Sequence, residues 1–121
     1  ALLEAHLAGI NAVKPGVTNT EIFNVVKNTL AELTKGKYDV SAWGAILGHG
    51  IGVGVHELPF FGRGAKEVKL EEGMYFCLEP ALWTHAGQIM IEDDLLVTRV
   101  GVEVLTKTER GVEVLVKSAA V

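Results

Sequence analysis

Two different hydrophobic periods divide the chain, and this division is the feature that most constrains its fold. In the first segment Leu3, Leu7 and Ile10 recur at helical spacing. Pro15 and Gly16 then follow, and both residues interrupt helices. The pattern predicts a first helix whose apolar face carries these three residues and which ends before Pro15.

A second helix is predicted from a capping-box pattern. Thr18 stands three residues before Glu21, the spacing at which each side chain can bond the backbone N–H near the other. Apolar residues then recur at helical spacing, at Ile22, Val26, Leu30 and Leu33. Lys35 and Gly36 end the pattern.

Beyond residue 42 the sequence changes to short runs typical of β-strands, separated by glycine and charge. The runs are residues 42–48, 52–58, 74–83, 88–100 and 102–108. Residues 62–73 are predicted to form a charged loop, and residues 84–87 a turn that joins two antiparallel strands. We therefore predict an α+β fold in which two N-terminal helices pack on a curved, mostly antiparallel sheet.

Composition narrows the class of protein. The 121 residues carry a net charge of -4 with both signs mixed along the chain, which argues against nucleic acid or anionic lipid as a partner. No apolar run reaches the roughly 20 residues of a membrane span. A single cysteine, Cys77, excludes an intramolecular disulfide and suits a reducing compartment. We expect a soluble, cytoplasmic protein with no nucleic acid or membrane partner.

The segment GHGIGVGVHELP, residues 48–59, places two histidines seven residues apart. Its glycine spacing fits neither a dinucleotide fingerprint nor a P-loop, so nucleotide binding is disfavoured. On a straight strand His49 and His56 would point to opposite faces, because side chains alternate. A turn or bulge among the glycines could bring both into one pocket, whereas either histidine alone could simply be a packed or surface residue.

Two glutamates interrupt apolar runs downstream. Glu79 lies in MYFCLEPALW, and Glu92 follows Ile89-Met90-Ile91. Each could lie at a strand end in solvent. A divalent cation shared with a histidine would instead compensate two buried carboxylates, which are costly when unpaired. His6 on the first helix and His85 in a turn are expected to be structural or surface residues.

Several motifs in order resemble the creatinase/aminopeptidase, or pita-bread, family. They are AGINAVKPGVTNTEI, GHGIGVGVHELP, EEGMYFCLEPALW, GQIMIEDDLLVT and LTKTER. The resemblance is closest to the prolidase and Xaa-Pro aminopeptidase branch and covers nearly the whole chain. It implies that residues 1–121 form the C-terminal half of a pita-bread metallohydrolase catalytic domain.

The resemblance also implies roles for individual residues. His49 and Glu79 would be metal ligands, Glu92 would bridge two metals, and His56 would contact the substrate and assist proton transfer. The cofactors would be two divalent ions, drawn from manganese, cobalt, zinc and iron, with a bridging water as nucleophile. The substrate would be a peptide or small amide, and the full-length protein a homodimer.

The same family completes its site with two upstream aspartates that this chain does not contain. Four carboxylates and a neutral histidine balance two divalent cations, whereas Glu79 and Glu92 alone balance one. Ala1 stands where an initiator Met would be, inside a helix already under way. We expect a fragment of a longer protein that binds metal weakly by itself and does not catalyse.

Departures near the site leave the substrate open. Met90 stands where prolidases commonly carry arginine, and a thioether cannot grip a carboxylate. Phe60, with Phe61 after it, occupies another position where some prolidases have arginine, although Arg63 is close by. Cys77 could approach the metal, but we favour a buried, inert thiol.

Two other functions therefore stay open beside Xaa-Pro hydrolysis. One is an enzyme like creatinase or ectoine hydrolase, or a lyase, acting on a small zwitterion. The other is a pita-bread binding module without metal. The metal-free binding module is the weaker of these alternatives, because the chain retains His49, Glu79 and Glu92, the residues that the resemblance implies as metal ligands.

Overall fold

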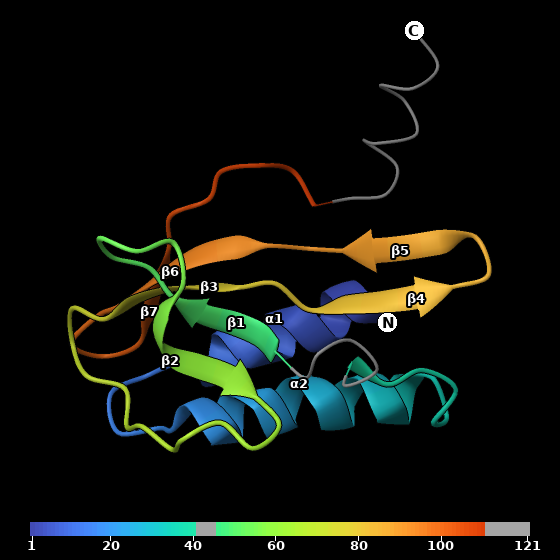
Figure 1. Cartoon of the computed structure of the whole chain (residues 1–121), viewed down its shortest axis with the longest axis horizontal. Coiled ribbons are helices and arrows are strands. Elements are labelled where there is room, and N and C mark those ends of the chain that lie inside the picture. The colour runs from blue at the N-terminus through green and yellow to red at the C-terminus, as the bar shows by residue number, and fades with distance from the viewer. Residues whose placement is uncertain (41–45, 111–121) are drawn as a thin grey trace, which may run out of the picture.

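The computed structural model describes residues 1–40 and 46–110, which form two helices and seven strands (Figure 1). The elements are α1 (Leu2–Ala12), α2 (Asn19–Leu33), β1 (Ile46–Gly50), β2 (Glu57–Gly62), β3 (Tyr75–Leu78), β4 (Ala81–Thr84), β5 (Gly87–Met90), β6 (Asp93–Val97) and β7 (Val102–Val104). Of the predicted run 42–48, residues 42–45 lie outside the described part. No helix among the described residues is long and apolar enough to cross a membrane.

Every pairing between strands of the described residues is antiparallel, in agreement with the predicted mostly antiparallel sheet. A five-stranded sheet has the order β2-β1-β3-β6-β7, and β4 and β5 form a separate hairpin. Figure 1 shows this hairpin extending beyond β3 and β6, away from the rest of the sheet. Its turn pairs Thr84 with Gly87, which confirms the predicted connection.

Helix α2 forms as the sequence predicts. The Thr18 side chain accepts a hydrogen bond from the Glu21 N–H, and the Glu21 carboxylate accepts one from the Thr18 N–H, so the capping box is complete. The helix ends at Leu33, and Lys35 and Gly36 both have positive φ. Local capping and termination signals therefore set both ends of this element.

The buried face of α1 differs from the predicted one. Leu7 is exposed and Leu3 half-buried, whereas the buried residues are Leu2, Ala5, His6, Gly9 and Ile10. Gly9 explains the change, because a Cβ there would collide with the Val26 side chain of α2. The helices approach through this small residue, and that contact rotates the face of α1 that meets the core.

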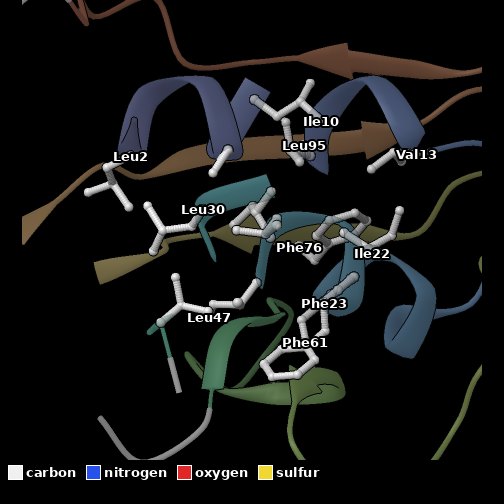
Figure 2. Packing of buried hydrophobic residues seen from close by; sticks show 14 of the residues in the cluster. Leu2, Ile10, Val13, Ile22, Phe23, Leu30, Leu47, Phe61, Phe76 and Leu95 are labelled. Atoms are coloured by element: carbon white, nitrogen blue, oxygen red, sulfur yellow. The ribbon is translucent and has the colours of Figure 1, made fainter. Parts of the chain in front are cut away.

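The core lies between the helices and the sheet (Figure 2). Side chains of α1 and α2 meet those of β1, β2, β3 and β6, including Leu47, Phe61, Phe76 and Leu95. The Phe61 and Phe76 rings are 4.5 Å apart between centroids. Because side chains alternate along a strand, the neighbours of these residues face away from the helices.

Four predicted strand runs need correction. Of the run 102–108, only Val102–Val104 form a strand, β7. Residues 52–56 are bends, and only Glu57 and Leu58 of the run 52–58 belong to β2. The Gly52 N–H bonds the Gly54 carbonyl and the Gly54 N–H bonds the Glu57 side chain, so these groups are satisfied locally and need no ladder. The runs 74–83 and 88–100 are each divided into two strands, at residues 79–80 and 91–92.

Candidate metal centre

Strand β1 carries His49 between two neighbouring strands. His49 pairs in register with Phe60 of β2 and with Cys77 of β3, and the residue is only 6% exposed. Glycines on either side permit this close packing: a Cβ at Gly48 would lie 2.5 Å from the Cys77 carbonyl oxygen, and one at Gly50 would strike the Leu58 carbonyl. Gly48 and Gly50 therefore serve close backbone approach rather than phosphate binding.

The hydrogen bond at one ring nitrogen of His49 fixes its tautomer. Nδ1 lies 3.0 Å from the Gly50 carbonyl oxygen, which can only accept, so Nδ1 carries the proton. Nε2 of the neutral ring then presents a lone pair. It faces Cys77 Sγ at 3.2 Å and Glu79 Oε1 at 3.4 Å. A backbone carbonyl that orients an imidazole in this way is typical of metal-binding histidines.

Glu79 and Glu92 lie opposite each other where two neighbouring strands are interrupted. Leu78 pairs with Asp93 on one side of the interruption, and Ala81 pairs with Met90 on the other. The same register sets Glu79 against Glu92. Pro80, which has no N–H to donate, ends β3, and its carbonyl accepts a hydrogen bond from the Ile91 N–H.

Electrostatics at this interruption favour a cation. Burial raises the pKa of the Glu79 carboxyl, and the charge of Glu92 raises it further, while His49 and His56 act in the opposite direction. A carboxylate oxygen and an imidazole nitrogen that face each other at 3.4 Å can share either a proton or a metal ion. The donor set therefore fits a divalent metal, although Glu92 is exposed and lies outside the tightest group of donors.

The two histidines meet, as the parity argument required. The His49 and His56 ring centroids are 4.3 Å apart, with an interplanar angle of 57°. The bends at residues 52–56 replace the straight strand that would have separated them. His56 is exposed and close enough to Glu79 to lower the pKa of its carboxyl.

Cys77 is buried beside the same donors. Burial raises the pKa of its thiol to about 12, and the charges of Glu79 and Glu92 act in the same direction. Without a cation nearby, the group is a neutral thiol and a poor nucleophile. Its sulfur, the Nε2 of His49 and a Glu79 oxygen all lie within 4.8 Å of one another. Among the described residues this is the group of donors that could hold an ion.

The three substrate-pocket candidates have different surroundings. Met90 is 52% exposed and lines an open pocket together with Glu92 and Arg110. Phe60 is half-buried beside His49. Arg63 forms an ion pair with Asp39 at 3.6 Å.

A second polar cluster was not predicted from sequence. His6 Nε2 donates a hydrogen bond to Asp93 Oδ2 at 2.7 Å, and Arg110 donates two more to the same carboxylate, at 2.6 and 2.9 Å. His6 and Asp93 are buried. The alternation of side chains along a strand could have predicted the position of Asp93. In the trio Glu92-Asp93-Asp94, the middle residue must face the helices when its neighbours face the candidate metal centre.

The chain belongs to metallopeptidase family M24, whose sequence profile matches residues 1–99. An Xaa-Pro dipeptidase of Pyrococcus horikoshii is 38% identical over 110 residues, which is 90% of this chain and 30% of that protein. An Xaa-Pro dipeptidase of Lactobacillus helveticus is 37% identical over 114 residues, which is 93% of this chain and 29% of that protein.

Solved structures agree with the profile. The prolidase from Pyrococcus horikoshii OT3 superposes with a TM-score of 0.79 at 38% identity, over 90% of this chain and 30% of that one. The two helices and the mostly antiparallel sheet match the pita-bread fold of the prolidase structures. The chain spans about 30% of the length of the relatives it matches.

Proposed function

We propose that the full-length protein is a metal-dependent dipeptidase that hydrolyses the bond before proline in Xaa-Pro substrates. The observation that carries this proposal is the convergence of His49 Nε2 and the Glu79 carboxylate, with Glu92 opposite, at one interruption of the sheet. The similarity to Xaa-Pro dipeptidases supports the substrate class. Residues 1–121 would be the C-terminal portion of the catalytic domain.

Each residue has a role in this proposal. His49, Glu79 and Glu92 hold divalent metal, and two further carboxylates outside this chain complete a site for two ions. Bound metal would supply Lewis-acid chemistry and lower the pKa of a water molecule. His56 stands beside the ligands at the exposed side of the site, where it can donate a hydrogen bond to the transition state and transfer a proton.

Replacing His56 by Ala in the full-length protein tests this division of roles. We expect turnover of an Xaa-Pro dipeptide to fall by about 10²- to 10⁴-fold, because a positioned acid–base group contributes that much. Metal content, measured by mass spectrometry, should stay unchanged. Loss of metal in this variant would show that His56 is a ligand instead. Glu79→Gln is the matched variant, in which both metal and activity should be lost.

One observation favours a second candidate function. Met90 lines the pocket beside Glu92 at the position where the resemblance predicted an arginine. A thioether cannot bind a substrate carboxylate through paired hydrogen bonds. The C-terminal carboxylate of a dipeptide would then lack this partner, so the second candidate is a creatinase-like or ectoine-hydrolase-like reaction, or a lyase reaction, on a small non-peptide substrate. A panel of Xaa-Pro dipeptides, other dipeptides and small amidino or cyclic amides decides the matter, since hydrolysis of Xaa-Pro alone supports the first proposal.

Three further expectations belong to the same proposal. The isolated 121-residue chain should bind metal weakly and be inactive, because Glu79 and Glu92 balance one divalent ion and not two. We also expect the full-length protein to be a cytoplasmic homodimer. Sedimentation of the purified protein and fractionation of cells test these two statements.

A further inference from the structure

Cys77 is fixed beside the atoms that would bind metal. Its backbone is paired on both sides, with His49 of β1 and with Asp94 of β6, and its side chain is fully buried. The sulfur lies 3.2 Å from His49 Nε2. Without metal, the thiol S–H points to the only lone pair that Nε2 has. A cation that takes this lone pair therefore arrives next to the sulfur.

The spacing of the three donors fits one coordination sphere. A tetrahedral ion with bonds of about 2.0 Å to nitrogen, 2.1 Å to oxygen and 2.3 Å to sulfur separates nitrogen from oxygen by about 3.4 Å and nitrogen from sulfur by about 3.5 Å. The structure has 3.4 Å between His49 Nε2 and Glu79 Oε1, and 3.2 Å between Nε2 and Cys77 Sγ. Cys77 Sγ and the Glu79 oxygen lie within 4.8 Å of each other, so the three atoms are close enough for side-chain adjustment to bring them to a single ion.

We propose that Cys77 is a sulfur ligand of the metal ion that His49 and Glu79 bind, and that this ligand makes the centre prefer zinc to manganese. On binding, the thiol proton leaves to solvent and a sulfur lone pair forms the bond to the cation. The thiolate would add one negative charge to the four carboxylates of the proposed two-ion site, so the occupied centre would carry a net charge of about -1. Soft thiolate ligands favour zinc, whereas sites built from carboxylates and water suit magnesium and manganese.

This inference rests on the proposed metal-binding roles of His49 and Glu79 and adds a ligand to them. It also changes the expectation of an inert thiol. The buried sulfur is inert only while no cation shares its position, because a coordinating thiol is deprotonated outright.

Cobalt spectroscopy of the full-length protein tests the proposal. Metal-free protein, kept reduced and without oxygen, is titrated with Co²⁺ and its absorption is recorded. Visible ligand-field bands report any bound cobalt, and a near-ultraviolet sulfur-to-cobalt charge-transfer band reports a thiolate ligand. We expect both in the wild type. In Cys77→Ser the visible bands should remain and the charge-transfer band should vanish.

Metal competition provides a readout of selectivity. Loss of even an outer-shell partner costs roughly 10- to 100-fold in metal affinity. Cys77→Ser should therefore lower the affinity for Zn²⁺ relative to Mn²⁺ by about tenfold or more, measured against a chelating dye. Circular dichroism of the metal-free variant checks its folding. If this variant does not fold, X-ray absorption of the wild-type zinc protein should still show a zinc–sulfur distance of about 2.3 Å.

The possible results separate this proposal from the proposed function. Visible cobalt bands without a charge-transfer band in the wild type overturn the Cys77 proposal and leave the metal site intact. A charge-transfer band that persists in Cys77→Ser also overturns it, because another sulfur is then the ligand. Failure of the wild type to bind cobalt, with no difference from Glu79→Gln, overturns both.

Discussion

At the scale of single residues, Asn19 connects three parts of the chain. Its side-chain amide donates to the Phe60 and Lys66 carbonyls, at 2.6 and 3.0 Å, and accepts from the Val68 N–H at 2.7 Å. The residue is completely buried. It therefore joins the start of α2 to β2, the strand next to His49, and to the loop of residues 62–73.

Replacing Asn19 by Ala should lower the free energy of unfolding by about 2 to 3 kcal/mol, because buried carbonyl and N–H groups lose their partners. Chemical denaturation measures the change. Asn28→Ala is the matched control, since Asn28 lies on the exposed face of the same helix, and it should change stability by less than about 0.5 kcal/mol. Equal effects would mean that the Asn19 hydrogen bonds contribute little.

His6 predicts how stability depends on pH. Burial lowers the pKa of His6 and outweighs Asp93, which acts to raise it. The folded protein therefore resists protonating this ring, whereas the unfolded chain protonates it below about pH 6.5. Stability should be fully present above that value and fall as the pH drops below it.

Melting temperatures between pH 7.5 and 5 measure this dependence. His6→Gln should flatten it, because the titrating ring is removed, while His85→Gln, at an exposed turn position, should leave it unchanged. An unchanged pH dependence in His6→Gln would assign the effect to other groups.

At the scale of elements, the sequence predicted the helices better than the strands. The capping box at Thr18 and the stop at Gly36 are local signals, and both hold in the structure. The face of α1 depended on packing at Gly9 against Val26, which helical spacing alone does not reveal. The prediction of a straight strand through residues 52–56 is wrong, because the Gly54 N–H donates to the Glu57 side chain and the segment bends.

The candidate site shows the same division. Glu79 was singled out because a carboxylate interrupts an apolar run, and Glu92 for the same reason. That the two strands are interrupted opposite each other depends on register, which pairs residues far apart in the chain. The His6–Asp93 contact spans 87 residues and could be inferred only once the strand faces were known.

The close approach of β1 and β3 at Gly48 can be tested by substitution. Gly48→Ala would place a Cβ against the Cys77 carbonyl and the Phe61 ring, so the free energy of unfolding should fall by about 1 to 3 kcal/mol. Gly101→Ala is the control, because a Cβ there meets nothing within 4 Å. Denaturant titration compares the two, and a Gly48→Ala protein as stable as Gly101→Ala would contradict the close approach of the strands.

At the scale of the whole molecule, the proposed metal centre would join two strands that are adjacent in the sheet but far apart in the sequence. His49 comes from β1 and Glu79 follows β3, so an ion held by both side chains binds the folded sheet and not the unfolded chain. Such binding adds to the stability of the entire domain.

Zinc at 100 times its dissociation constant should raise the free energy of unfolding of the full-length protein by about 2.7 kcal/mol. Thermal unfolding with and without the ion measures this change. Glu79→Gln should abolish it, whereas Glu103→Gln, at an exposed position on β7, should keep it. An increase that persists in Glu79→Gln would place the bound ion elsewhere.

Successive side chains of Glu92-Asp93-Asp94 point to opposite faces of the sheet, and this restricts which insertions and deletions the sequence can tolerate here. Asp93 is held against α1 by His6 and clamped by Arg110, while Glu92 acts on Glu79 at the opposite face. Sliding this strand by one residue would exchange the two carboxylates between core and site. The hydrogen bonds to Asp93 thus fix the register of β6. Deleting or inserting one residue next to Asp93 would disturb the candidate metal centre and the core together.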